Sequence, residues 1–398
     1  MTRLGNKFLG AMLLIIGTCL GAGMLALPVS TAEYGLIPSL FLFFACWAVM
    51  SYTGLLILEV THWCDKDANI ITMAEKTLGK AGQIFAWISY LMLLYCLMAA
   101  YLSGMNALLV SYIQNMFHQH IATWMGSVGL VLLFGMIIYL GPKPIDYINR
   151  ILFAGLIVSF FALAILISPE ITTAQLLPRN FHHAWAALPI IITAFGFHII
   201  IPSVRTYLND DVKRLRLAIL FGALIAMVVY TLWEILVLGT IPLAGEHGLR
   251  MMLQHGQPTV DLTSALHAKT GSTWVDDISK TLALSLISTS FIGVSFSLFD
   301  FLADGFHIKK NKLGRLSTAL ITFVPPLIFM LVYPGGFILA LGYGGIFVAA
   351  LLIILPALMV WSGRYKHNLH SDYRAPGGKI ALACTIIFAL IIITAELI

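Results

Sequence analysis

The first long apolar segment of the chain is interrupted by Gly17-Thr18-Cys19-Leu20-Gly21-Ala22-Gly23, and Pro28 follows. A second apolar segment is interrupted by Phe195-Gly196-Phe197-His198, and Pro202 follows there. Glycine and proline in such places break a helix and free backbone N–H and C=O groups, which lipid cannot satisfy. Broken helices are tolerated where their backbone lines a cavity, so the two stretches together predict a binding site.

The composition is that of a polytopic membrane protein. Hydrophobic residues make up 60% of the chain and charged residues 10%, whereas soluble domains average about 45–50% and about 25%. Apolar runs long enough to cross a bilayer recur along the whole sequence. They predict eleven spans, at roughly 8–31, 36–60, 83–113, 124–140, 148–168, 185–206, 214–240, 278–302, 314–333, 336–361 and 379–397.

The basic residues predict the orientation of these spans. Of the 23 Lys and Arg residues, the outer side would keep only Arg179, Arg250, Lys269 and Lys280. The positive-inside rule therefore predicts a cytoplasmic N-terminus and, with eleven spans, a periplasmic C-terminus. The net charge of +5 follows from this topology, so nucleic acid need not be invoked as a partner.

The two broken segments occupy the first and the sixth span. This spacing predicts an all-α fold with a five-plus-five inverted repeat, residues 8–168 and 185–361, and an additional helix at 379–397, all within one transporter domain, 1–398. Ordinary helix packing through small residues is the alternative explanation of each break taken alone. The longest loop, 241–277, is expected to form a partly ordered lid on the outside.

The breaks differ in the chemistry that they offer. Opening the helix at Gly17 exposes N–H groups at the start of a new half-helix, where Gly21, Ala22 and Gly23 can bind a carboxylate through their backbone. Thr18 adds a hydroxyl. The carbonyl groups freed around Gly196 suit an ammonium group, so the pair predicts a zwitterionic amino acid as the ligand.

Aromatic side chains at the expected depth of this site add a second indication. They are Tyr95, Tyr101, Phe195, Phe197, Phe291 and Tyr343. Rings with a few polar tips suit an aromatic substrate, although aromatic residues are common in any membrane core. The five cysteines form no CxxC motif and no cluster with histidine, so neither a metal nor a cofactor is expected.

Few titratable side chains fall inside the spans. His198 is the histidine deepest in a span, and it either carries protons, donates to a substrate hydroxyl, or packs as a neutral ring. Glu234 is either a proton carrier or an acid that reaches water at the membrane interface. Thr289 and Ser290 either bind a coupling cation or bond to their own helix.

Acidic residues also stand at the inner ends of two spans. Asp300 and Asp304 are one helical turn apart and form either an inner gate or a solvated helix end that pairs with the basic loop after it. Glu59 is similarly placed at the end of the second span.

Several motifs carry a family likeness. They are residues 17–28, Asn149-Arg150, Phe195-Gly196-Phe197-His198, Leu298-Phe299-Asp300-Phe301-Leu302-Ala303-Asp304, Tyr333-Pro334-Gly335-Gly336-Phe337 and Ala340-Leu341-Gly342-Tyr343. From end to end the chain resembles the hydroxy and aromatic amino acid permeases, and within them the tyrosine-specific members. The resemblance implies a fold of the amino acid-polyamine-organocation transporter type, in the bacterial inner membrane.

It also implies proton-coupled import of an aromatic amino acid, with tyrosine first and tryptophan or a broader aromatic range as the alternative. One departure concerns the coupling ion, since relatives can carry a lysine in the fifth span where this chain reads Ile151-Leu152-Phe153-Ala154-Gly155-Leu156. Without that fixed charge, sodium coupling through Thr289 and Ser290 stays open. A non-transporting sensor or a channel can share such a fold. The sequence lacks a signalling domain, a ring of like charges and the spacing of catalytic residues, which disfavours a sensor, a channel and an enzyme in turn.

Overall fold

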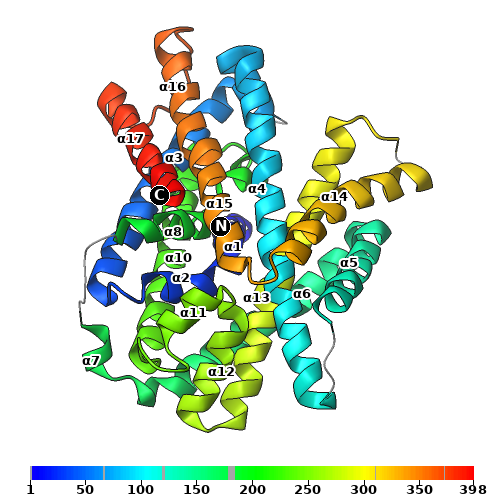
Figure 1. The fold of residues 1–398 in the computed structure, drawn as a ribbon. Helices are drawn as coiled ribbons and strands as arrows, with labels where there is room; N and C mark the ends of the chain where they lie inside the picture. The colour runs from blue at the N-terminus through cyan, green and yellow to red at the C-terminus, as the bar shows by residue number, and fades with distance from the viewer. Residues whose placement is uncertain (1, 66–67, 119–121, 178–183, 310, 372) are drawn as a thin grey trace.

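A computed structural model describes the whole chain except residues 1, 66–67, 119–121, 178–183, 310 and 372. Arg179, one of the four outer basic residues, thus lies outside the described residues. The described part consists of helices without any strand (Figure 1). Within the described residues, ten helices are long and apolar enough to cross a membrane, and the number is eleven if a bent helix pair is counted as one span. The prediction of an all-α, multi-pass membrane protein with about eleven spans is confirmed.

Helices of the N-terminal half begin with the broken pair. In chain order they are α1 (Thr2–Cys19), α2 (Gly23–Thr31), α3 (Leu36–Trp63), α4 (Ile70–Phe117), α5 (Thr123–Leu140), α6 (Pro142–Ile167), η1 (Ser168–Glu170) and α7 (Thr173–Leu176). The axes of α1 and α2 differ by 56° across the break. Helix α4 is longer than the predicted span because a kink at Gly79, where φ is 72°, joins a short preceding helix to it.

The second broken segment opens the C-terminal half. In chain order its helices are η2 (Ala184–Ala187), α8 (Leu188–Ala194), η3 (His198–Ile200), α9 (Ile201–Tyr207), α10 (Val212–Thr240), α11 (Leu249–His255), α12 (Pro258–Thr270), α13 (Thr273–Gly305), α14 (Lys312–Val332), α15 (Phe337–Val348), the π-helical η4 (Ala349–Ile354), α16 (Leu355–Tyr365) and α17 (Gly378–Leu397). The sixth predicted span thus comprises η2, α8, η3 and α9.

The broken helices lie in the middle of the bundle (Figure 1). Helix α1 packs on α10, and α2 packs on both α8 and α10. Around them, α4 packs on α15 and α16, while α13 packs on α6. Helices α5, α14 and α17 lie at the periphery and keep large apolar side chains exposed, as lipid-facing helices do.

The predicted lid, 241–277, is helical and covers one end of the bundle. It contains α11 and α12, which pack against α2, while α12 also packs on α4 and α13. The Thr259 hydroxyl donates to the Gly104 carbonyl at 3.2 Å, and Arg250 Nε lies 2.7 Å from Glu33 Oε1. These contacts close this end of the molecule.

At the C-terminal end of α3, buried charged side chains connect this helix to its neighbours. Glu59 is 1% exposed, and its carboxylate accepts from Arg364 Nε at 2.7 Å and from the Ala375 N–H at 2.7 Å. Nearby, Arg205 of α9 donates to the Thr61 carbonyl. Of the two interpretations left open for Glu59, the solvated helix end is wrong, because Arg364 and a backbone N–H replace water around the carboxylate.

Candidate functional site

The first break leaves three residues between α1 and α2. After Cys19 the helix ends, and the Met24 N–H donates to the Gly21 carbonyl at 3.0 Å, which starts the second half-helix. The N–H of Ala22 points away from this ladder and donates to Ser290 Oγ on α13 at 3.2 Å. The N-terminus of α2 therefore offers backbone donors in the interior of the bundle, as the sequence predicts.

The second break lies directly opposite, and a tyrosine connects the two. The hydroxyl of Tyr230 on α10 lies 2.5 Å from the Cys19 carbonyl and 2.8 Å from the Ala194 carbonyl, so it donates to the last residue of α1 or of α8. Tyr230 is fully buried. The sequence analysis missed this residue, although a hydroxyl in the span next to a broken helix is a candidate for pairing freed carbonyls.

A cavity of about 520 Å³ lies between the two breaks. We call it the central cavity. Of the predicted site residues, eight line it: Gly17, Thr18, Gly21, Gly23, Tyr101, Gly196, Thr289 and Ser290. Ala22 is fully buried and does not line the cavity, but its N–H donates to Ser290 Oγ, which does. The structure thus brings both breaks to one cavity.

Small residues are required where the break meets α13 and α8. A Cβ atom at Gly21 would lie 2.7 Å from Ser290 Oγ, and one at Gly23 would lie 3.5 Å from the Cβ of Ala194. The first distance is far below van der Waals contact, so a side chain at Gly21 would displace Ser290 Oγ, which accepts the Ala22 N–H. Glycine here permits the close approach that the backbone site needs.

The cavity hydroxyls bond to their own helices. Thr18 donates to the Leu14 carbonyl at 2.7 Å, Thr289 to the Ser285 carbonyl at 2.9 Å, and Ser290 to the Leu286 carbonyl at 2.8 Å. Each hydroxyl therefore uses its proton within its own helix, and the Ser290 oxygen also accepts the N–H of the break.

The predicted aromatic wall is only partly present. Tyr101 lines the central cavity, whereas Tyr95, Phe195, Phe197, Phe291 and Tyr343 do not. The Tyr95 hydroxyl donates to a carbonyl of α14, Phe195 packs edge-on against Tyr230, and Tyr343 is 43% exposed on the outside of α15. Phe197 stacks on His198, and Phe291 packs edge-on against a ring of α5.

Other residues supply the wall in their place. Tyr90, Phe153, Asn149 and Thr193 line the central cavity and were not predicted as site residues. Tyr90 lies more than one helix turn before Tyr95 on α4, and Phe153 belongs to α6, where no aromatic site residue was expected. Asn149 belongs to a quoted motif, and a polar amide at the start of a span was a signal that could have singled it out.

The two titratable candidates lie outside the central cavity. Glu234 on α10 is fully buried and accepts from the Thr31 hydroxyl at the far end of α2, while its Oε2 has no partner among the described residues. His198 is 1% exposed, and its Nε2 lies 2.7 Å from Thr53 Oγ1 on α3. Glu234 therefore contacts the end of α2, and His198 belongs to the second break. Neither side chain lines the central cavity.

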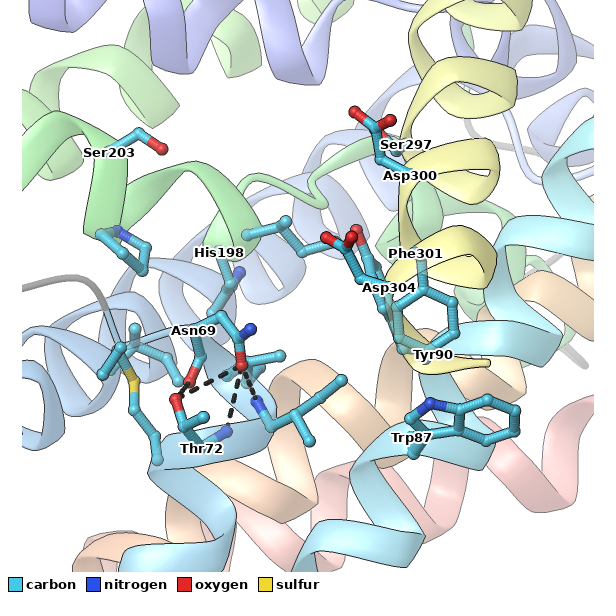
Figure 2. Close-up of a pocket in the computed structure, with 18 of the residues that line it drawn as sticks. Asn69, Thr72, Trp87, Tyr90, His198, Ser203, Ser297, Asp300, Phe301 and Asp304 are labelled. Carbon is cyan, nitrogen blue, oxygen red and sulfur yellow. Dashed lines mark hydrogen bonds between the residues drawn. The ribbon is translucent and has the colours of Figure 1, made fainter. Parts of the chain in front are cut away.

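A second cavity of about 600 Å³ adjoins the first and is drawn in Figure 2. We call it the vestibule. It contains the gate candidates Asp300 and Asp304 of α13, and His198 lies in its wall. Tyr90 and Ile199 line both cavities, as does Ser297 of α13, so these side chains stand between the two spaces.

Comparison with known proteins gives a consistent result over the whole length. Residues 4–396 match the tryptophan/tyrosine permease family. The chain is 36% identical to the tyrosine-specific transport system 1 of Haemophilus influenzae over 97% of this chain and 96% of that protein. It is 30% identical to a tryptophan-specific transport protein of the same organism, over 98% and 96%.

A protein of Aliivibrio fischeri named glutamine transporter 2 is also 30% identical, over 98% of this chain and 99% of that one. These relatives are transporters and not enzymes. The family model covers residues 4–396, so the chain belongs to the tryptophan/tyrosine permease family.

Proposed function

We propose that this protein imports an aromatic amino acid, L-tyrosine in the first place, across the bacterial inner membrane by proton symport. The observation that carries the proposal is the meeting of the two breaks around one cavity of amino-acid size. The names of the tyrosine- and tryptophan-specific relatives support the aromatic class.

The chemistry of the cavity fits a zwitterion. In our proposal the substrate carboxylate binds the backbone donors at the N-terminus of α2, beside Gly21 and Gly23, where the helix dipole is positive. The ammonium group binds carbonyls at the second break, near Gly196. The ring then lies against Tyr101 and Phe153, the aromatic part of the cavity wall.

Proton coupling is proposed to act through Glu234. Helix α2 begins at the carboxylate site and ends at Thr31, whose hydroxyl donates to Glu234. Its 9 residues span about 13 Å. Loss or gain of a proton at Glu234 changes what Thr31 can donate to, and the half-helix carries that change to the binding site.

Sodium is the less favoured ion. Ser290 Oγ already accepts the Ala22 N–H, so one lone pair of this oxygen remains for a cation. Thr289 lines the same cavity but offers only one hydroxyl oxygen. A sodium ion needs several oxygen ligands at once, as other hard cations do.

The helix contacts support the inverted repeat. If residues 8–168 and 185–361 are related by a pseudo-twofold axis, the third and tenth spans are related to the eighth and fifth. Helix α4 is the third span and packs on α15 and α16 of the tenth span. Helix α13 is the eighth span and packs on α6, the fifth. Such an axis would relate the first of these contacts to the second. With the N-terminus in the cytoplasm, the vestibule opens inward and the lid, 241–277, closes the outside.

Uptake into proteoliposomes tests the proposal. Labelled L-tyrosine should accumulate against its gradient when the lumen is alkaline, and tryptophan and phenylalanine should compete. Glutamine, named for one relative, serves as the competitor outside the aromatic class. Failure of all three aromatic amino acids to accumulate would refute the aromatic class, and accumulation driven only by a sodium gradient would refute the proton.

A further inference from the structure

We propose that Asn149 of α6 binds the phenolic hydroxyl of the substrate and thereby selects tyrosine over phenylalanine. The inference rests on the proposed function, because it takes the ligand of the central cavity to be an aromatic amino acid whose carboxylate binds at the first break. Asn149 lines this cavity, in the part of the wall that α6 supplies.

The serine and threonine hydroxyls of the cavity wall have their protons engaged by main-chain carbonyls. Besides the three described above, Thr193 donates to the Pro189 carbonyl at 2.8 Å, and Ser297 donates to the Gly293 carbonyl at 2.8 Å. Such a hydroxyl still accepts a hydrogen bond, but it has no proton left for a ligand. Among the described residues that line the cavity, none is an Asp, Glu, Lys, Arg or His. A ligand hydroxyl that needs both a donor and an acceptor therefore requires another group.

The carboxamide of Asn149 offers both functions. Its oxygen accepts and its NH₂ group donates. Within the described part of the chain, no other Asn or Gln lines the central cavity, and the Asn149 side chain makes no hydrogen bond there. A phenolic hydroxyl also donates and accepts, so the two groups are complementary.

The position of Asn149 matches the shape of tyrosine. The carboxylate site begins at Gly21, and Gly17 lies four residues before it, about 6 Å nearer the start of α1. A Cβ atom at Gly17 would lie 3.9 Å from the ring of Phe153, so the ring subsite adjoins this point. Asn149 lies four residues before Phe153, about 6 Å along α6 and on the same helix face. Both helices run outward in the proposed orientation, so carboxylate, ring and hydroxyl meet Gly21, Phe153 and Asn149 in that order.

The charged neighbours of Asn149 pair with each other. Arg150 Nη2 lies 2.9 Å from Asp146 Oδ2, and neither residue lines the central cavity. Asn149 is therefore the polar group that α6 presents to the cavity. Phenylalanine in the same position leaves the carboxamide without a partner, and a site that binds a substrate hydroxyl discriminates against the analogue that lacks it.

A cycle of two substrates and two proteins tests this assignment. The KM values for tyrosine and for phenylalanine are measured from initial rates of uptake into proteoliposomes, with the unaltered protein and with Asn149→Leu, which keeps a similar side-chain size without polar atoms. The unaltered protein should have the lower KM for tyrosine. In Asn149→Leu the ratio of the phenylalanine KM to the tyrosine KM should fall about fivefold, which corresponds to about 1 kcal/mol for the lost hydrogen bond.

Other variants control for folding and for a competing partner. Asn149→Ala also removes the amide and should lower the KM ratio as Asn149→Leu does, so the result does not depend on the folding of one variant. Ser297→Ala removes a wall hydroxyl whose proton is already engaged, and Tyr90→Phe removes the hydroxyl of a ring that borders the vestibule. Both should leave the KM ratio within about twofold.

Equal KM values of the unaltered protein for tyrosine and phenylalanine would overturn the assignment. An unchanged KM ratio in the Asn149 variants would overturn it too, including the case in which both KM values rise together, because that pattern indicates a structural role. A fall of the ratio in Tyr90→Phe as large as that in Asn149→Leu would also count against it. Failure of the unaltered protein to accumulate any aromatic amino acid is a separate result that contradicts the proposed function.

Discussion

Tyr230 is the side chain that links the two breaks, and its replacement tests whether that link matters for transport. Tyr230→Phe keeps the ring, its burial and its edge contact with Phe195. It removes only the hydroxyl that lies 2.5 Å from the Cys19 carbonyl and 2.8 Å from the Ala194 carbonyl. Both carbonyls end half-helices at the wall of the central cavity.

The magnitude follows from the hydrogen bond that is lost. One hydroxyl proton serves one carbonyl at a time, so the variant loses a single bond. Such bonds in membrane proteins average about 0.6 kcal/mol and reach about 1.7 kcal/mol. At 1.4 kcal/mol per tenfold change, the equilibrium constant for the arrangement that binds substrate falls by about 3-fold to about 16-fold, and its population falls by that factor where it is the minor state. The apparent KM should rise by the same factor, because binding is reduced by the fraction of competent molecules.

Initial rates of tyrosine uptake into proteoliposomes measure this factor. Tyr95→Phe is the matched control, since it removes one hydroxyl that donates to the Ile321 carbonyl at 2.8 Å, outside both cavities. Tyr95→Phe should leave KM within about twofold. An unchanged KM in Tyr230→Phe, or an equal rise in both variants, would refute the role of Tyr230 as the link between the breaks.

Further variants test three other contacts of the molecule. Ser290→Ala leaves the N–H at the first break without its acceptor and should raise the KM for tyrosine several-fold, whereas Thr289→Ala removes only a bond within its own helix and should change it less; equal losses in uptake assays would contradict this. Glu234→Gln should abolish uphill accumulation driven by a pH gradient while tyrosine counterflow persists, and accumulation that stays pH-driven would exclude Glu234 as the proton carrier. Glu59→Gln should lower the free energy of unfolding in detergent by about 3–5 kcal/mol, because it leaves Arg364 buried without its charged partner. Replacing both residues by apolar ones should recover most of that loss.

Breaks and spans were accessible from the sequence because lipid forbids most alternatives. An apolar run of the required length has to cross the membrane, and glycine and proline inside it have to face a cavity. The residues that line the cavity were harder to predict. Successive residues point about 100° apart around a helix axis, so an error of one position turns a side chain from the cavity toward lipid. Tyr343 is exposed on α15 for this reason, and Phe195 packs behind the second break instead of beside the substrate.

Partners that are distant in sequence explain the other differences. Glu59 looked like a solvated helix end, and only the fold brings Arg364 within 2.7 Å of it. Tyr230 drew no attention because the carbonyls that it contacts lie 211 and 36 residues away. Composition and periodicity indicate which face of a helix is apolar. They do not indicate which polar atom of another helix contacts a given polar side chain.

The contacts on the two sides of the vestibule favour a movement of two helix pairs against each other, α3 with α9 and α4 with α13, over the movement of a single helix. On one side of the vestibule, α9 is tied to α3 by the bond from Arg205 to the Thr61 carbonyl. On the other side, α4 and α13 are joined by the contact of Trp87 with Phe301. Closing the vestibule by moving one pair of helices against the other preserves both sets of contacts. Moving α9 alone would take the Thr61 carbonyl from the buried Arg205 and leave it only Asp210 as an acceptor. The unwound residues around Gly196 are where such a movement costs least, because no helical hydrogen bond continues through them from α8 into α9.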